Sequence, residues 1–126
     1  PDHCVQGTSG VEFHPSLNTS QIAKVFPKGT NPEVDSYSGF FDNDKKSSTG
    51  MGEWLRENNV SEVVVVGLAL DYCVKATALD AVNLGFKTSV LLEGTKAVNI
   101  SPDDGEKAIS ELQKAGVIIV SNKMAA

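Results

Sequence analysis

The chain has 126 residues, of which 40% are hydrophobic and 21% charged, as expected for one soluble domain with a modest core. Its net charge of -5 and the absence of any basic cluster argue against a nucleic-acid-binding protein. No apolar stretch is long enough to cross a bilayer, which excludes a membrane-spanning protein. Two cysteines, Cys4 and Cys73, make no disulfide framework, so we predict a cytoplasmic protein with free thiols.

The predicted elements of the first half begin after a polar loop over residues 1–20. Ile22–Phe26 is short, apolar and β-branched, and Pro27 ends it, so we predict a strand. Residues 32–49 are rich in Gly, Asn, Asp and Ser and predict a long loop, which in a compact domain is often functional. Met51–Glu57 has apolar residues at helical spacing and predicts a helix.

The second half alternates apolar strands with amphipathic helices. We predict strands at Glu62–Val66, Thr88–Leu92 and Val117–Val120, and helices at Cys73–Leu84 and Asp103–Ala115. Alternation of this kind predicts the α/β class, with a doubly wound (Rossmann-like) parallel sheet and helices on both faces.

Cys73 follows a buried strand and a short turn, and it opens a helix. Backbone N–H groups and the positive end of the helix dipole favour a thiolate at such a position, which makes Cys73 a candidate nucleophile. The alternative is a small buried hydrophobic residue, and this segment alone leaves both readings open. Lys28 also follows a predicted strand end, so we expect both side chains at the same edge of the sheet.

Four parts of the chain carry recognisable motifs, in this order: Pro1–Thr8, Val25–Gly29 with Asp35–Phe40, Gly67–Ala81 and Lys96–Asn99. They resemble, in the same order, the motifs of nicotinamidases, which are isochorismatase-like cysteine hydrolases. The resemblance covers essentially the whole chain as one domain, residues 1–126, but the family's N-terminal strands are missing from it. The chain therefore looks like the C-terminal portion of such a domain.

The resemblance implies an amidohydrolase of NAD salvage that converts nicotinamide to nicotinic acid and ammonia. In the implied reaction, Cys73 attacks the amide carbonyl to form a thioester, and Lys28 stabilises the thiolate. The backbone N–H groups of Ala69 and Cys73 form the oxyanion hole. A non-proline cis peptide between Leu68 and Ala69 belongs to the same motif.

Three side chains are candidates for binding the substrate ring. Leu68 and Tyr72 lie within the cysteine motif, and Phe40 follows the lysine motif. Phe40 suits an apolar slot for a flat aromatic ring. Ordinary core packing is the alternative for Tyr72 and Phe40. Asp71 is expected to shape the pocket or hold the turn.

His3 is the candidate metal ligand. One histidine is never a metal site by itself. The resemblance makes His3 one ligand of a divalent metal, commonly zinc, whose other ligands come from an Asp-x-His motif. That motif and the family's catalytic aspartate lie before the residues present here, on the same or a separate chain. The other histidine, His14, matches no metal-binding pattern.

Two rival hypotheses remain open. The first is another isochorismatase-like cysteine hydrolase, although the motif at His3 favours a nicotinamidase. The second is an inactive fragment that needs the missing N-terminal segment. The expected ligand is a small molecule, with no nucleic-acid or membrane partner, and the sequence leaves the oligomeric state open.

Overall fold

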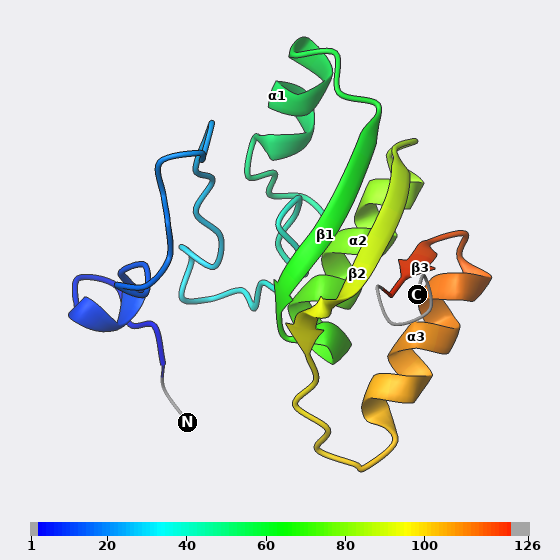
Figure 1. The fold of residues 1–126 in the computed structure, drawn as a ribbon. Helices are drawn as coiled ribbons and strands as arrows, with labels where there is room; N and C mark the ends of the chain where they lie inside the picture. The colour runs from blue at the N-terminus through cyan, green and yellow to red at the C-terminus, as the bar shows by residue number, and fades with distance from the viewer. Residues whose placement is uncertain (1–2, 122–126) are drawn as a thin grey trace.

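The computed structural model describes residues 3–121 and has an open three-stranded parallel sheet in the order β1-β2-β3 (Figure 1). The strands are β1 (Glu62–Leu68), β2 (Lys87–Lys96) and β3 (Ile118–Val120). The helices are α1 (Met51–Glu57), α2 (Lys75–Asn83) and α3 (Asp104–Lys114), with a 3-10 turn at Ser9–Val11 and a π-helix at Leu70–Val74. The predicted α/β class with a parallel sheet is confirmed.

The register of the sheet fixes which side chains share a face. Val65 of β1 lies opposite Val90 of β2, which in turn lies opposite Ile119 of β3. The pairing of β1 with β2 shifts between Val65 and Gly67, so that Gly67 lies opposite Thr95. β2 therefore bulges near its carboxyl end, and this end of the sheet departs from a regular ladder.

The core lies between one face of the sheet and two helices. Val65 and Val90 pack with Val74, with Ala78 of α2 and with Leu112 of α3 in a single cluster. A second cluster joins Phe40, Ala81 and Phe86, against which Val63 and α1 residues pack. Within residues 3–121, α2 and α3 thus cover the same face of the sheet.

The opposite face and the free edge of β1 are exposed. Val64, Val66 and Leu68 are 60%, 52% and 73% exposed, and Ile118 and Val120 of β3 are exposed as well. In the described part of the chain, β1 pairs only with β2. We predicted helices on both faces of the sheet, but within residues 3–121 this face of β1 is left uncovered.

The N-terminal arm, residues 3–30, differs most from the prediction. The predicted strand Ile22–Phe26 is wrong, since these residues pair with no strand among residues 3–121. Ile22 and Val25 are 42% and 52% exposed. Their β-branched side chains favour a strand only where they can pack against a neighbouring strand, and these residues have no such neighbour among residues 3–121. The arm runs along the β1 side of the sheet, drawn in blue to cyan (Figure 1).

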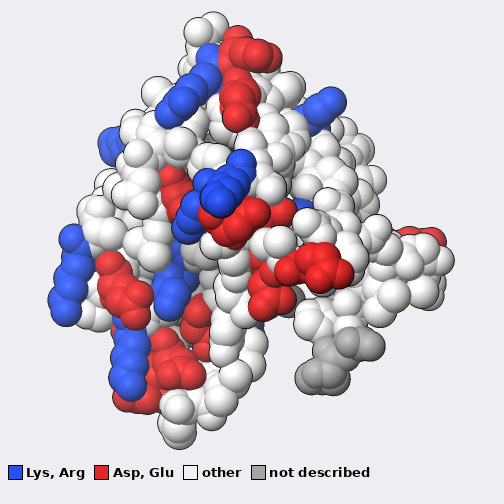
Figure 2. Space-filling model, turned by 180° about the vertical axis from the view of Figure 1, so that it is seen from behind, with Lys and Arg blue, Asp and Glu red and all other residues white. Residues whose placement is uncertain are grey.

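The surface carries charges of both signs. Seen from behind, basic and acidic side chains are interspersed, with no continuous basic patch on this face (Figure 2). Within residues 3–121, no helix has both the length and the apolarity that crossing a membrane demands.

Candidate active site

Cys73 lies in the π-helix that joins β1 to α2. The carbonyl of Ala69 accepts hydrogen bonds from the N–H groups of Tyr72 (3.1 Å) and Val74 (3.0 Å), which close this wide turn. The Leu68–Ala69 peptide is cis, as the resemblance implies. The predicted helix start at Cys73 is therefore corrected: helical backbone begins at Leu70, and a π turn leaves no periodicity in the sequence that would reveal it.

Lys28 contacts Cys73. Its Nζ lies 3.5 Å from Cys73 Sγ and donates a second hydrogen bond, of 3.0 Å, to the carbonyl oxygen of Ser36. The predicted proximity of the two side chains is confirmed, although residues 3–27 contain no strand. In general, an ammonium group this close to a thiol favours the thiolate, which is the nucleophilic form.

A cavity of about 180 Å³ opens where these two side chains meet. The carboxyl end of β1 and Val74 of the π-helix form apolar walls, and the ammonium, the thiol and the hydroxyl of Thr77 supply the polar groups. A cavity with apolar walls and few polar groups suits a small, flat molecule. Its lining is Lys28, Gly39, Val65, Val66, Gly67, Leu68, Cys73, Val74 and Thr77.

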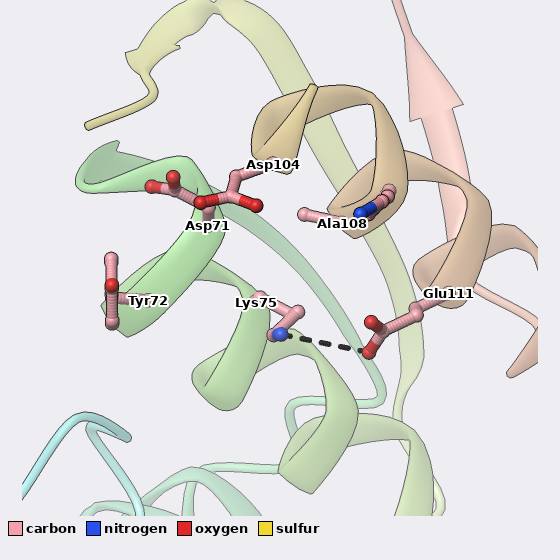
Figure 3. Close-up of a pocket in the computed structure, with 7 residues that line it drawn as sticks. Asp71, Tyr72, Lys75, Asp104, Ala108 and Glu111 are labelled. Carbon is pink, nitrogen blue, oxygen red and sulfur yellow. Dashed lines mark ion pairs between the residues drawn. The ribbon is translucent and has the colours of Figure 1, made fainter. Parts of the chain in front are cut away.

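A larger cavity, of about 230 Å³, lies between the π-helix and α3 (Figure 3). Its walls are charged, and Lys75 pairs there with Glu111 at 3.5 Å. Neither Cys73 nor Lys28 lines it, so we place the chemistry in the smaller cavity despite its size. The lining of the larger cavity is Asp71, Tyr72, Lys75, Asp104, Lys107, Ala108 and Glu111.

The three candidate substrate-binding residues separate in the structure. Leu68 lines the cavity that contains Cys73. Tyr72 instead lines the charged cavity and meets Tyr37 edge to face at 5.6 Å. Phe40 is 2% exposed and stacks on Phe86 at 6.0 Å, so it is a core residue and not part of the slot. The oxyanion-hole role of Ala69 and Cys73 stays a prediction.

Asp71 fastens the π-helix to the loop after β2. Its two carboxylate oxygens accept hydrogen bonds from the N–H groups of Val98 (3.0 Å) and Asn99 (2.9 Å). Burial alone would raise the pKa of Asp71. These two bonds, together with one from its own N–H and the nearby charge of Lys75, outweigh burial and hold the pKa below its ordinary value. Asp71 therefore holds the turn that carries Cys73, one of the two roles that we expected.

Asp71→Asn is expected to lower the free energy of unfolding by about 1–3 kcal/mol at neutral pH, because one backbone donor loses a charged acceptor. Asp71 has a lower pKa folded than unfolded. Its contribution is therefore complete above the unfolded-state pKa and lost as pH falls through the folded-state value. Urea unfolding of the variant and the parent protein, between neutral and acidic pH, should show the difference shrinking with acid. A constant difference would contradict this account.

The residues of the structure do not form a metal site. His3 is exposed, and among residues 3–121 no three His, Cys, Asp or Glu side chains lie close enough together to hold an ion. The ring of His14 is used locally, since its Nδ1 accepts a hydrogen bond from Ser16 N–H at 3.1 Å. His3 can therefore be only one ligand of a larger set.

Sequence reasoning missed the contacts made by Lys28 and by the loop that follows it. The carbonyl of Ser36 accepts from Lys28, Thr77 accepts a hydrogen bond from Gly39 N–H at 2.9 Å, and Asp80 pairs with Lys45 at 2.8 Å. Thr77 and Asp80 follow Cys73 by four and seven residues, a helical spacing that places them on one side of a helix. That helical spacing is the feature of the sequence by which Thr77 and Asp80 could have been found.

Comparison with known proteins places these features in a family. The chain matches the isochorismatase domain over residues 1–124. It is 50% identical over 119 residues to the Nicotinamidase of Escherichia coli, an alignment that covers 94% of this chain and 56% of that protein.

Solved structures give the same result. PnC1 from L. infantum in complex with nicotinate superposes with a TM-score of 0.91 at 36% identity, over 98% of this chain and 61% of that one. The Pyrazinamidase of Pyrococcus horikoshii in complex with zinc gives 0.82 at 38% identity, over 96% and 62%. This chain thus spans about six tenths of the length of these proteins. It belongs to the isochorismatase family.

Proposed function

We propose that this chain carries the nucleophile and the lysine of a nicotinamidase, which hydrolyses nicotinamide to nicotinic acid and ammonia in NAD salvage. The observation that carries the proposal is the 3.5 Å contact between Lys28 Nζ and Cys73 Sγ in a small cavity at the carboxyl end of β1. Ligands of parallel sheets bind at this end. The Escherichia coli relative named Nicotinamidase supports the choice of substrate.

In the proposed reaction the Cys73 thiolate attacks the carbonyl carbon of the amide, and the oxygen takes up negative charge. The N–H groups of Ala69 and Cys73 donate hydrogen bonds to that oxygen, and the Lys28 ammonium adds a positive charge nearby. The C–N bond then breaks, and the nitrogen leaves as ammonia after gaining a proton. Water attacks the resulting thioester, releases nicotinic acid and leaves the sulfur free.

The proton transfers need a general acid–base that residues 3–121 do not place beside Cys73 Sγ. The resemblance assigns this task to an aspartate in the part of the domain that precedes these residues. A divalent metal, zinc as in the Pyrococcus horikoshii protein, would take His3 as one ligand and its other ligands from that same part. Since the ligand set is incomplete here, we assign no step of the reaction to the metal.

The test is ammonia release by a completed domain, meaning this chain joined to the part of the Escherichia coli relative that precedes its matched residues. We expect nicotinamide hydrolysis by the completed domain and none by the 126-residue chain alone, because the acid–base group is supplied only in the former. A folded completed domain that leaves nicotinamide intact would contradict the proposal. Hydrolysis of a carbamoyl amide instead would favour another cysteine hydrolase of the family.

A further inference from the structure

Lys28 depends on a distant loop for its position. It lies on an exposed segment without secondary structure, and its ammonium makes two hydrogen bonds, to Cys73 Sγ and to the carbonyl of Ser36. The Ser36 carbonyl is therefore the fixed point that holds the ammonium beside the sulfur. Ser36 begins a loop over residues 36–49, which we call loop 36–49.

Loop 36–49 is attached at two points to α2, the helix that follows Cys73. The N–H of Gly39 donates to Thr77 Oγ1 at 2.9 Å, and Lys45 Nζ lies 2.8 Å from Asp80 Oδ1. Thr77 also lines the cavity that contains Cys73. The helix that follows the nucleophile therefore also anchors the loop that holds the lysine.

The ion pair between Lys45 and Asp80 is not an ordinary surface pair. The Asp80 side chain is only 7% exposed, whereas that of Lys45 is 63% exposed. Asp80 Oδ2 is buried and has no hydrogen-bond partner in the described part of the chain. Exposed pairs contribute little to stability, but a buried carboxylate that loses its single cation is left uncompensated. Asp80 therefore constrains where Lys45 can lie.

Hydrogen bonds join the Lys45 turn to the two residues that flank Ser36. Lys45 N–H donates to the carbonyl of Asp42 at 2.8 Å and closes a turn that contains Asn43. Asn43 N–H donates to the carbonyl of Asp35 at 2.9 Å, and its side-chain oxygen accepts from Tyr37 N–H at 3.2 Å. The two neighbours of Ser36 are thus both tied to the turn that Asp80 holds.

We propose that the Lys45–Asp80 ion pair positions Lys28 against Cys73, by fastening loop 36–49 to α2. Neither residue lines the cavity, so both are positioning residues and neither touches the substrate. This inference rests on the proposed role of Cys73 as the nucleophile. It adds that the reactivity of the Cys73 thiol depends on the ion pair of Asp80, which lies two helical turns after Cys73.

The experiment measures alkylation of Cys73 by iodoacetamide as a function of pH in the completed domain, with the modified peptide followed by mass spectrometry. For Lys45→Met and for Asp80→Asn we expect the profile to be displaced toward slower alkylation. The rate at neutral pH then falls about tenfold, because the ammonium no longer stays beside the sulfur. Lys28→Met removes the ammonium itself, so its profile shows the largest displacement that losing the contact between Lys28 and Cys73 can cause.

The controls separate positioning from general destabilisation. Lys46→Met removes the same charge from the neighbouring position of the loop and should leave the profile unchanged. Lys45→Arg keeps the cation and should restore the parent profile. Adding Lys45→Met to Lys28→Met should displace the profile no further, since the contact is already lost. A merely structural role would lower the melting temperature while the profile stayed in place.

An unchanged profile in folded Lys45→Met and Asp80→Asn, beside a displaced profile in Lys28→Met, would overturn the inference. An unchanged profile in Lys28→Met would also overturn it, since there would then be no effect to transmit. Failure of the proposed function is a separate result, because it is read from nicotinamide hydrolysis by the unsubstituted domain. The alkylation profile uses no substrate.

Discussion

Cys73→Ala in the completed domain is expected to lower kcat for nicotinamide hydrolysis by at least about a thousandfold, since removal of a nucleophile eliminates the covalent route. Cys73 supplies the one thiol among the described residues that line the cavity; the others are apolar or glycine, apart from Lys28 and Thr77. Substrate binding should largely survive, because the apolar walls at the end of β1 remain. Steady-state assay and nicotinamide titration of the same preparation measure both effects.

Cys4→Ser is the matched control, because Cys4 is the second free cysteine and is exposed. This variant should keep the parent rate, and it should keep the alkylation profile of Cys73. Retained turnover in pure Cys73→Ala would place the chemistry elsewhere in the molecule. Equal loss in both variants would show that the assay reports general damage to the protein and not the loss of one sulfur atom.

The second large effect concerns the free edge of β1. The isolated 126-residue chain is expected to self-associate and to lack a protected β1, because this strand exposes unpaired N–H and C=O groups beside apolar side chains. Covering Val64, Val66 and Leu68 would contribute about 1 kcal/mol or more for each side chain. A strand from the rest of the domain, lying beside β1, would satisfy both needs.

Size measurement and hydrogen exchange compare the isolated chain with the completed domain. We expect the completed domain to be less associated and to protect the amides of Glu62–Leu68. Val64→Lys should reduce association of the isolated chain and impair the completed domain. Val98→Lys is the control, as Val98 is similarly exposed but lies beyond β2. A monomeric isolated chain with protected β1 amides would show that the strand has been placed wrongly.

The sequence predicted the elements whose signals are local. The helix Met51–Glu57 has the predicted bounds, and the helix after Ser101 begins within one residue of its prediction. Glycines past the ends of two helices, Gly85 and Gly116, both adopt positive φ, as the C-terminal ends of helices require. Strand ends were less accurate: β2 extends to Lys96, because a bulge prolongs its pairing with β1.

The sequence predicted one contact of the site correctly, but the reason for expecting it was only half right. The contact between Lys28 and Cys73 was expected because both were thought to follow strands. Only Cys73 does, while the Ser36 carbonyl of a distant loop holds Lys28. Phe40 was misplaced because an aromatic residue beside a motif suits a core and a binding slot equally well. Contacts such as Lys45 with Asp80 join residues 35 positions apart and depend on loop geometry, which local patterns do not encode.

Gly94 lies in the bulge of β2, opposite the carboxyl half of β1. A Cβ atom built there would lie 2.6 Å from Cγ1 and 3.0 Å from Cβ of Val66, so even alanine would push β1 aside. Val66 itself lines the cavity, two residues before the peptide that leads into the cysteine turn. A genetic screen for loss of function should therefore recover changes at Gly94 alongside changes at Cys73. Such a map of inactivating mutations would outline the packing behind the cavity as well as the cavity.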